Sequence, residues 1–199
     1  AADALSFEDA VKLVHLRGKY MNEAVPAGLG GMAAVLGADR HKLHELCQEI
    51  SDSGSLVELA NMNCPGQIVV SGSAEGVKQL AERVKESGAK RAIPLEVSGP
   101  FHSSLMKPAA DQLKQAISEI TFSEAKIDRQ QISRYFVDQV DSPVLWEDSV
   151  RWMIEQGVKQ FIEVGPGKVL AGLIRKIDRN VKVYSASDPG TIEALREED

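Results

Sequence analysis

The sequence has few cysteines and no excess of positive charge. Among its 199 residues only Cys47 and Cys64 are cysteines, too few for the disulfide framework of a small secreted domain. Lysine and arginine number 23 against 29 acidic residues, which gives a formal net charge of -6. A chain of this charge lacks the basic surface of nucleic-acid and anionic-membrane binders, so neither is expected as a partner.

Long apolar runs are also lacking. No apolar stretch approaches the length of a bilayer span, and the first residues carry no signal-peptide pattern. A cytoplasmic location is therefore the default expectation. The hydrophobic fraction of 43% and the charged fraction of 26% are typical of a globular protein. The length suffices to bury a substantial core, in one large domain or two small ones.

Several common catalytic motifs do not occur: there is no GxSxG nucleophile elbow, P-loop, HExxH motif or kinase signature. The glycines of GLGGMA (28–33) superficially match a dinucleotide fingerprint, but the predicted strand follows them instead of preceding them. His41, His44 and Cys47 fan over about 120° of a predicted helix, so we expect a solvated helix face and no metal site.

The most informative stretch of the sequence is VSGPFHSSLM (97–106), which joins a predicted strand to a predicted helix. An alternating apolar run (92–97) predicts a strand before it, and helical spacing predicts a helix over 104–118 after it. A strand end would fix the His102 imidazole while the loop leaves it reachable for proton transfer. The alternative is a helix-capping turn, with Ser103 or Ser104 as N-cap and His102 without a role.

A helix is predicted over 7–24, with Ser6 as its N-cap. One face of this helix is apolar except for an arginine; its residues are Ala10, Leu13, Val14, Arg17 and Met21. An arginine in such a stripe either lies at its edge or awaits an anion. The planar guanidinium suits a carboxylate, because it donates two parallel hydrogen bonds.

The middle of the chain follows the order strand, helix, strand, strand, helix, strand. The predicted ranges are 32–37, 39–52, 56–62, 67–72, 74–87 and 90–97. This is the order of a ferredoxin-like unit. We therefore predict a ferredoxin-like subdomain at 31–97, inserted into a body formed by 1–30 and 98–199.

The last third of the chain again alternates helices and strands. The predictions are a short strand at 121–126, helices at 128–140 and 146–156, a strand at 160–164, a helix at 169–177, a strand at 181–185 and a terminal helix at 191–196. The turn GPGK (165–168) joins a strand to a helix. It is either a tight turn that needs glycine for backbone reasons or an anion site at a helix N-terminus.

Four motifs resemble the malonyl-CoA:acyl carrier protein transacylases of fatty-acid synthesis, in family order and spacing. They are LRGKYM (16–21), ANMNCPGQIVVSG (60–72), GAKRAIPL (88–95) with the following 97–106, and EVGPGKVL (163–170). The resemblance implies an α/β class acyltransferase fold, here a partial α/β-hydrolase-like body with an inserted ferredoxin-like subdomain.

The resemblance also implies an activity: transfer of malonyl from malonyl-CoA, through a serine acyl-enzyme, to the phosphopantetheine thiol of acyl carrier protein. His102 matches the general base. Gln139 matches the residue whose backbone carbonyl orients that histidine. Arg17 matches the partner of the free malonyl carboxylate. The other substrate-binding residues implied are Asn63, Met21 and Phe101, whose ring would exclude a branching methyl; malonyl-CoA is a substrate, and no cofactor or metal is implied.

Two family segments have no counterpart in the sequence. One is the N-terminal third with the GQG loop and the GHSxGE elbow that carries the nucleophile; the other is a stretch of roughly fifteen residues near 127–128, more than a usual loop variation. Ser103 and Ser104 lack an elbow and do not replace the nucleophile. We expect either a fragment or a shortened paralogue, inactive in isolation. The alternative function is a non-catalytic module that binds acyl carrier protein or a CoA thioester.

Overall fold

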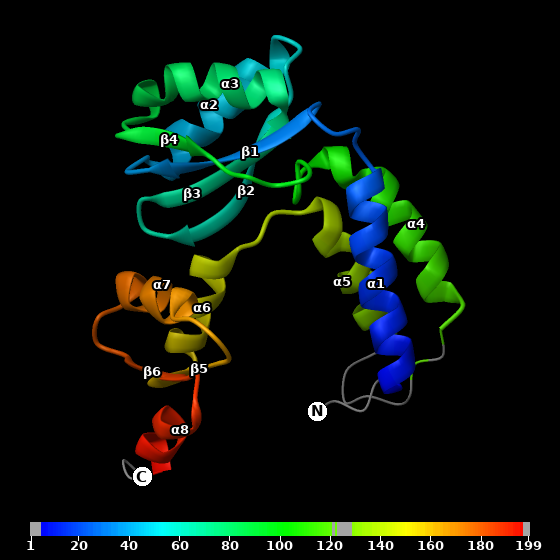
Figure 1. Ribbon diagram of the computed structural model, residues 1–199. Helices are drawn as coiled ribbons and strands as arrows, with labels where there is room; N and C mark the ends of the chain where they lie inside the picture. The colour runs from blue at the N-terminus through cyan, green and yellow to red at the C-terminus, as the bar shows by residue number, and fades with distance from the viewer. Residues whose placement is uncertain (1–4, 121, 123–128, 197–199) are drawn as a thin grey trace.

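The computed structural model describes residues 5–120, 122 and 129–196. Its elements form three groups: a sheet with two helices on one face, a set of three long helices beside it, and a smaller α/β unit below it (Figure 1). The His102 loop joins the first group to the second. Within the described ranges, no helix combines the length and the apolarity that a membrane crossing requires.

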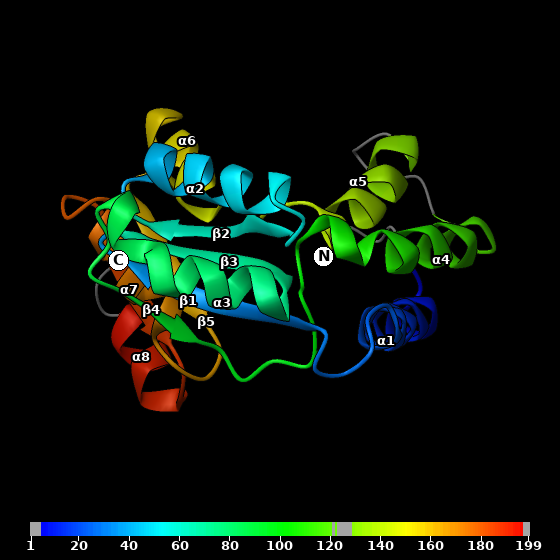
Figure 2. The same ribbon diagram turned by 90° about the horizontal axis from the view of Figure 1, so that it is seen from above.

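The first group is a four-stranded antiparallel sheet with the order β2-β3-β1-β4. Its strands are β1 (Gly30–Leu36), β2 (Val57–Cys64), β3 (Gln67–Ser73) and β4 (Arg91–Pro94), and its helices are α2 (Arg40–Asp52) and α3 (Ala74–Arg83). Both helices cover the same face of the sheet (Figures 1 and 2). The element order and strand order confirm the predicted ferredoxin-like unit. Its boundaries at 31 and 97 stay a prediction.

The core of this unit lies between the sheet and α2. Asp39 begins the helix, because its carboxylate accepts the Lys42 N–H at 3.0 Å. Leu43 and Ile50 then recur at helical spacing and are buried against Val35 of β1. Burial of these side chains supplies the main driving force for packing, about 1.5–3 kcal/mol for each large aliphatic residue.

The predicted solvated face of α2 is wrong in one residue. His41 and His44 are exposed, but Cys47 is buried in the core, where burial raises the pKa of its thiol to about 12. The steps of three carry the last side chain around the helix to the sheet side. In the part of the chain that the structure describes, no three His, Cys, Asp or Glu side chains gather as metal ligands.

The second group consists of α1 (Phe7–Glu23), α4 (Lys107–Ser118) and α5 (Arg129–Asp141). The Ser6 hydroxyl accepts the Asp9 N–H and caps α1, as predicted. Leu13 and Met21 of α1 are buried with Leu113 of α4. Val14 lies on the predicted face of α1 but is 68% exposed.

The third group contains a parallel pair of strands. Its elements are α6 (Trp146–Glu155), β5 (Gln160–Val164), α7 (Val169–Ile177), β6 (Lys182–Ala186) and α8 (Pro189–Arg196). Val144, just before α6, extends the first sheet: the Met62 N–H donates to its carbonyl at 2.9 Å, and its N–H donates to Ala60 at 2.8 Å. These two bonds fix the start of the third group against β2.

After the GPGK turn, a carboxylate of the protein itself binds the N-terminus of α7. The Glu163 carboxylate accepts the N–H groups of Leu170 at 3.1 Å and Ala171 at 2.8 Å. Gly165 and Gly167 have φ of 123° and 99°, which side chains avoid. The turn interpretation therefore holds, and the anion-site interpretation is wrong because Glu163 satisfies these donors.

The remaining predictions mostly agree with the structure within a few residues. The strand β4 is shorter than predicted and ends at Pro94, because the chain turns away toward the His102 loop. Two predictions, the strand at 121–126 and the deficit near 127–128, lie outside the described residues except for Phe122, which is buried in the second group.

Candidate functional site

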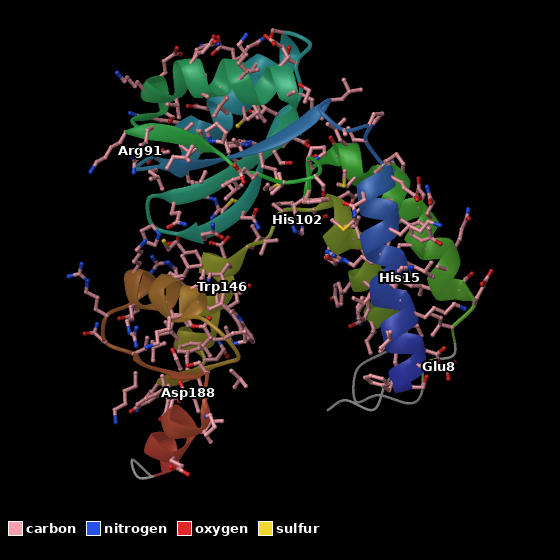
Figure 3. The ribbon with its side chains drawn as sticks, in the orientation of Figure 1. Glu8, His15, Arg91, His102, Trp146 and Asp188 are labelled. Atoms are coloured by element: carbon pink, nitrogen blue, oxygen red, sulfur yellow. The ribbon has the colours of Figure 1, made fainter. Side chains whose placement is uncertain are left out.

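His102 lies in the loop between β4 and the short 3-10 turn η2 (Ser104–Met106), between the sheet and the group of three helices (Figure 3). It is the one described non-glycine residue with a left-handed backbone, at φ 58°. Such a conformation is uncommon outside glycine and persists only where the surroundings enforce it. The buried hydroxyl of Ser103 donates to the Pro100 carbonyl at 2.6 Å and closes the turn.

A carboxylate from the sheet holds the far end of this loop. Glu58 of β2 accepts the Ser104 N–H at 2.7 Å and the Ser104 hydroxyl at 2.9 Å. Ser103 occupies the N-cap position of η2, as the capping alternative predicted, but it makes no side-chain cap hydrogen bond there. The donors at the start of the turn are satisfied across the boundary between the sheet and the helices.

The ring of His102 is oriented by α5. Its Nδ1 lies 3.1 Å from the backbone carbonyl oxygen of Gln139. A carbonyl only accepts, so Nδ1 carries the proton and Nε2 keeps its lone pair. Burial lowers the pKa of His102, and the charge of Arg17 lowers it further, while hydrogen bonds to the backbone of Gln139 and Ser142 oppose the shift. The ring is neutral at pH 7 and can accept a proton.

The same residue of α5 also contacts Arg17. Nη2 of Arg17 donates to Oε1 of Gln139 at 2.7 Å, and Nε2 of Gln139 donates to the Phe136 carbonyl at 2.9 Å. Burial lowers the pKa of Arg17, yet an arginine keeps its charge in proteins. A fixed positive charge therefore lies next to the histidine.

Arg17 and His102 line one cavity of about 370 Å³. Its wall is formed by Arg17, Gly18, Met21, Asn22, Met32, Phe101 and His102. Phe101 also packs with Met32, Ala60 and Val69 on the face of the sheet opposite to α2 and α3. A second, larger cavity of about 830 Å³ between α2, β2 and the segment after α5 also reaches His102.

The structure thus brings together five of the six predicted site residues. Arg17, Met21, Phe101 and His102 share the cavity, and Gln139 contacts two of them. Asn63 lies near the end of β2 and lines neither of the cavities that contain His102. Its side chain is half-buried.

Some residues at the site were not predicted. Asn22 lines the cavity and accepts a hydrogen bond from the Ser98 hydroxyl at 2.7 Å. Helical spacing did not indicate it, because Asn22 lies about 140° around the helix from Arg17. No local pattern points to Glu58 or to the side chain of Gln139, because their partners lie 46 and 122 residues away in the sequence.

Comparison with known proteins decides the family. A model of the acyl transferase domain matches residues 1–188. The chain belongs to this family. Over 205 residues this acyl transferase chain is 51% identical to the malonyl CoA-acyl carrier protein transacylase of Bacillus subtilis, covering 97% of the chain and 65% of that protein. The enzyme of the same name from Staphylococcus aureus is 47% identical, over 100% of the chain and 68% of the relative.

Solved structures share the fold. The complex of a type II PKS acyl-carrier protein with its malonyl-transacylase matches with a TM-score of 0.94 and 37% identity, over 100% of this chain and 68% of that one. The transacylase from Streptococcus pneumoniae matches with a TM-score of 0.91 and 41% identity, again over 100% and 68%. This acyl transferase chain therefore has the acyltransferase fold that the sequence motifs implied. It spans about two thirds of the length of these relatives.

Proposed function

We propose that this acyl transferase chain supplies the base and the carboxylate-binding arginine for transfer of malonyl from malonyl-CoA to acyl carrier protein. The observation that carries the proposal is the shared cavity: Arg17 and His102 line it together, and Gln139 contacts both. A neutral imidazole beside a fixed cation matches an acyl group that carries a free carboxylate.

The proposed reaction has two half-reactions, acylation of a serine and transfer of the acyl group to a thiol. Nε2 of His102 takes the proton of a serine hydroxyl as its oxygen attacks the thioester carbonyl, and the CoA thiolate leaves and takes up that proton. Nε2 then deprotonates the phosphopantetheine thiol, whose sulfur attacks the serine ester, and the serine oxygen leaves and is reprotonated. The Gln139 carbonyl holds the ring and stabilises the imidazolium in both halves. The 199 residues contain no GxSxG elbow for that serine, so this chain contributes the other groups.

Selectivity for malonyl would come from the walls of the cavity. The Arg17 guanidinium would pair with the free carboxylate, and the ring of Phe101 would leave no room for a methyl branch beside it. Met21 contributes apolar surface to the same cavity. For Asn63 the proposal has no such support, because Asn63 lines neither cavity.

The partners and the location follow from the same proposal. Acyl carrier protein is supported by the related transacylase solved in complex with its acyl-carrier protein. Protein groups alone perform both proton transfers, so the reaction needs no cofactor beyond malonyl-CoA as substrate. Both cysteines are buried free thiols, which suits the reducing cytoplasm.

Calorimetric titration of the chain with malonyl-CoA and acetyl-CoA tests the proposal. Removing one partner of a desolvated arginine–carboxylate pair costs about 2–5 kcal/mol. Arg17→Ala should therefore weaken malonyl-CoA binding by roughly 30-fold to several thousand-fold, at about 1.4 kcal/mol per tenfold. Acetyl-CoA binding should not change.

Two further variants complete this test. Arg17→Lys should restore malonyl-CoA binding only in part, because a point charge does not make the two-pronged contact. Arg134→Ala on the exposed side of α5 serves as control and should bind both ligands like the wild type. Equal losses for malonyl-CoA and acetyl-CoA in Arg17→Ala would refute the proposal.

A further inference from the structure

We infer that the side chain of Gln139 is a positioning residue that decides which edge of the Arg17 guanidinium meets the substrate carboxylate. The inference rests on the proposed function and adds a role for the amide side chain, separate from the backbone carbonyl that contacts His102. It starts from one bond: Nη2 of Arg17 donates to Oε1 of Gln139 at 2.7 Å.

A guanidinium has two edges that can hold a carboxylate with two parallel hydrogen bonds. One edge uses N–H groups of Nε and Nη2, the other uses those of Nη1 and Nη2. Nη2 has two hydrogens, one on each edge. Whichever hydrogen Gln139 accepts, it occupies one edge and leaves the other complete. The amide therefore removes one of the two possible binding orientations.

Arg17 lines two cavities, and Gln139 lines only one of them. Gln139 does not line the cavity that Arg17 shares with His102. With Arg17 it lines a different cavity of about 380 Å³, whose remaining wall is Ile132, Tyr135 and Phe136. The amide of Gln139 thus contacts the guanidinium outside the cavity that Arg17 shares with His102. The inference assigns the remaining free edge of Arg17 to the cavity that it shares with His102.

The amide of Gln139 is itself held in one orientation. Its Nε2 donates to the Phe136 carbonyl, one helical turn earlier on α5, at 2.9 Å. Since the NH₂ group has this acceptor, the carbonyl oxygen Oε1 is the atom directed at Arg17. The backbone carbonyl of the same residue contacts Nδ1 of His102 at 3.1 Å. One residue of α5 therefore sets both the cation and the base.

Two substitutions separate the side chain from the backbone. Gln139→Met keeps the length and the main-chain carbonyl but removes the acceptor of Arg17. The released guanidinium then samples several rotamers, and we expect malonyl-CoA to bind about tenfold more weakly, with acetyl-CoA unchanged. Gln139→Glu places a carboxylate on Arg17 that competes with the substrate, so its loss should exceed that of Gln139→Met.

A second readout needs no substrate. Phenylglyoxal modifies arginines that are free to react, and peptide mass spectrometry resolves each site. In the ligand-free chain we expect Arg17 to react severalfold faster in Gln139→Met than in the wild type. The exposed Gln131, on the same helix, provides controls: Gln131→Met and Gln131→Glu add the same groups and should change neither binding nor labelling.

The outcomes distinguish this inference from the proposed function. If the wild-type chain shows no preference for malonyl-CoA over acetyl-CoA, the proposed function fails and the inference falls with it. If the preference exists and Arg17→Ala abolishes it, but Gln139→Met retains both the preference and the Arg17 labelling rate within twofold, the inference alone is overturned. A parallel loss of both ligands in Gln139→Met would also overturn it, because that result indicates a structural role.

Discussion

Gly30 and Pro100 are packed so closely that no side chain fits between them. A Cβ on Gly30 would lie 2.4 Å from Cδ and 2.5 Å from Cγ of the Pro100 ring. Gly30 is the first residue of β1, and Pro100 lies two residues before His102. The start of β1 therefore limits how closely the His102 loop can approach the sheet, through direct contact.

The Gly30 contact leads to the first prediction. Gly30→Ala must push Pro100 aside and should lower the free energy of unfolding by about 1–3 kcal/mol. It should also shift the NMR signals of the His102 ring. Gly31→Ala is the matched control, because a Cβ on Gly31 meets no atom within 4 Å. Equal stability and equal His102 signals in the two variants would contradict this account of the loop.

Glu58 is the second support of the loop. Glu58→Ala removes the acceptor of the Ser104 N–H and hydroxyl, and should cost about 1 kcal/mol of stability. Amide hydrogen exchange at Ser104 should become faster, since its N–H loses its partner. Glu96→Ala, at an exposed position outside this contact, is the control. Unchanged exchange at Ser104 would show that the carboxylate does not hold the turn.

The pH dependence of His102 has a definite sign. Burial lowers the pKa of His102 in the folded chain, so the unfolded chain binds a proton at higher pH than the folded chain does. This site's contribution to stability is complete above the ordinary pKa of about 6.5 and is lost as the pH falls from there toward the folded value. NMR titration should give a His102 pKa below 6.5, and Arg17→Ala should raise it by removing a nearby positive charge. A His102 pKa at or above 6.5 in the wild type would contradict the prediction.

Large apolar side chains on the surface predict self-association of the 199-residue chain. Phe7, Val164 and Val169 are 86%, 81% and 72% exposed, and they lie on the second and third groups of elements. Exposed apolar surface of this kind favours association. Sedimentation velocity should show dimers or larger species, and Val164→Thr with Val169→Thr should reduce them. Residues 30–98, whose core is their own, should fold as a monomer. A monomeric full chain with a cooperative melt would contradict this prediction.

Local patterns predicted most of the fold because each signal lies within one element. Asp39 caps α2, and the spacing of Leu43 and Ile50 marks its buried face. The order of six elements then gave the ferredoxin-like strand order, since few topologies satisfy such an order. Cys47 was wrongly assigned to a solvated face, because helical spacing gives the direction of a side chain around the helix but not which neighbouring element covers it.

The site was harder to predict than the fold. The loop that carries His102 could be located by its strand and helix, but its left-handed backbone could not, because the residues that hold the loop, Gly30 against Pro100 and Glu58 against Ser104, lie elsewhere in the chain. The Arg17 and Gln139 side chains meet across 122 residues of sequence. Their predicted roles came from resemblance to a family, and no pattern within either helix indicates the bond between them.

The central claim is that Arg17 recognises the free carboxylate of the acyl group while His102 serves as base. To test it, the chain is joined to the part of the Bacillus subtilis relative that the alignment leaves uncovered, and kcat/KM is measured for malonyl-CoA and acetyl-CoA. The 199-residue chain alone should show only the background rate. In the joined protein, Arg17→Ala should lower kcat/KM for malonyl-CoA by roughly 30-fold to several thousand-fold and leave the value for acetyl-CoA equal or higher. An equal fall for both substrates would contradict the claim, because it would show that Arg17 supports the fold and does not recognise the substrate.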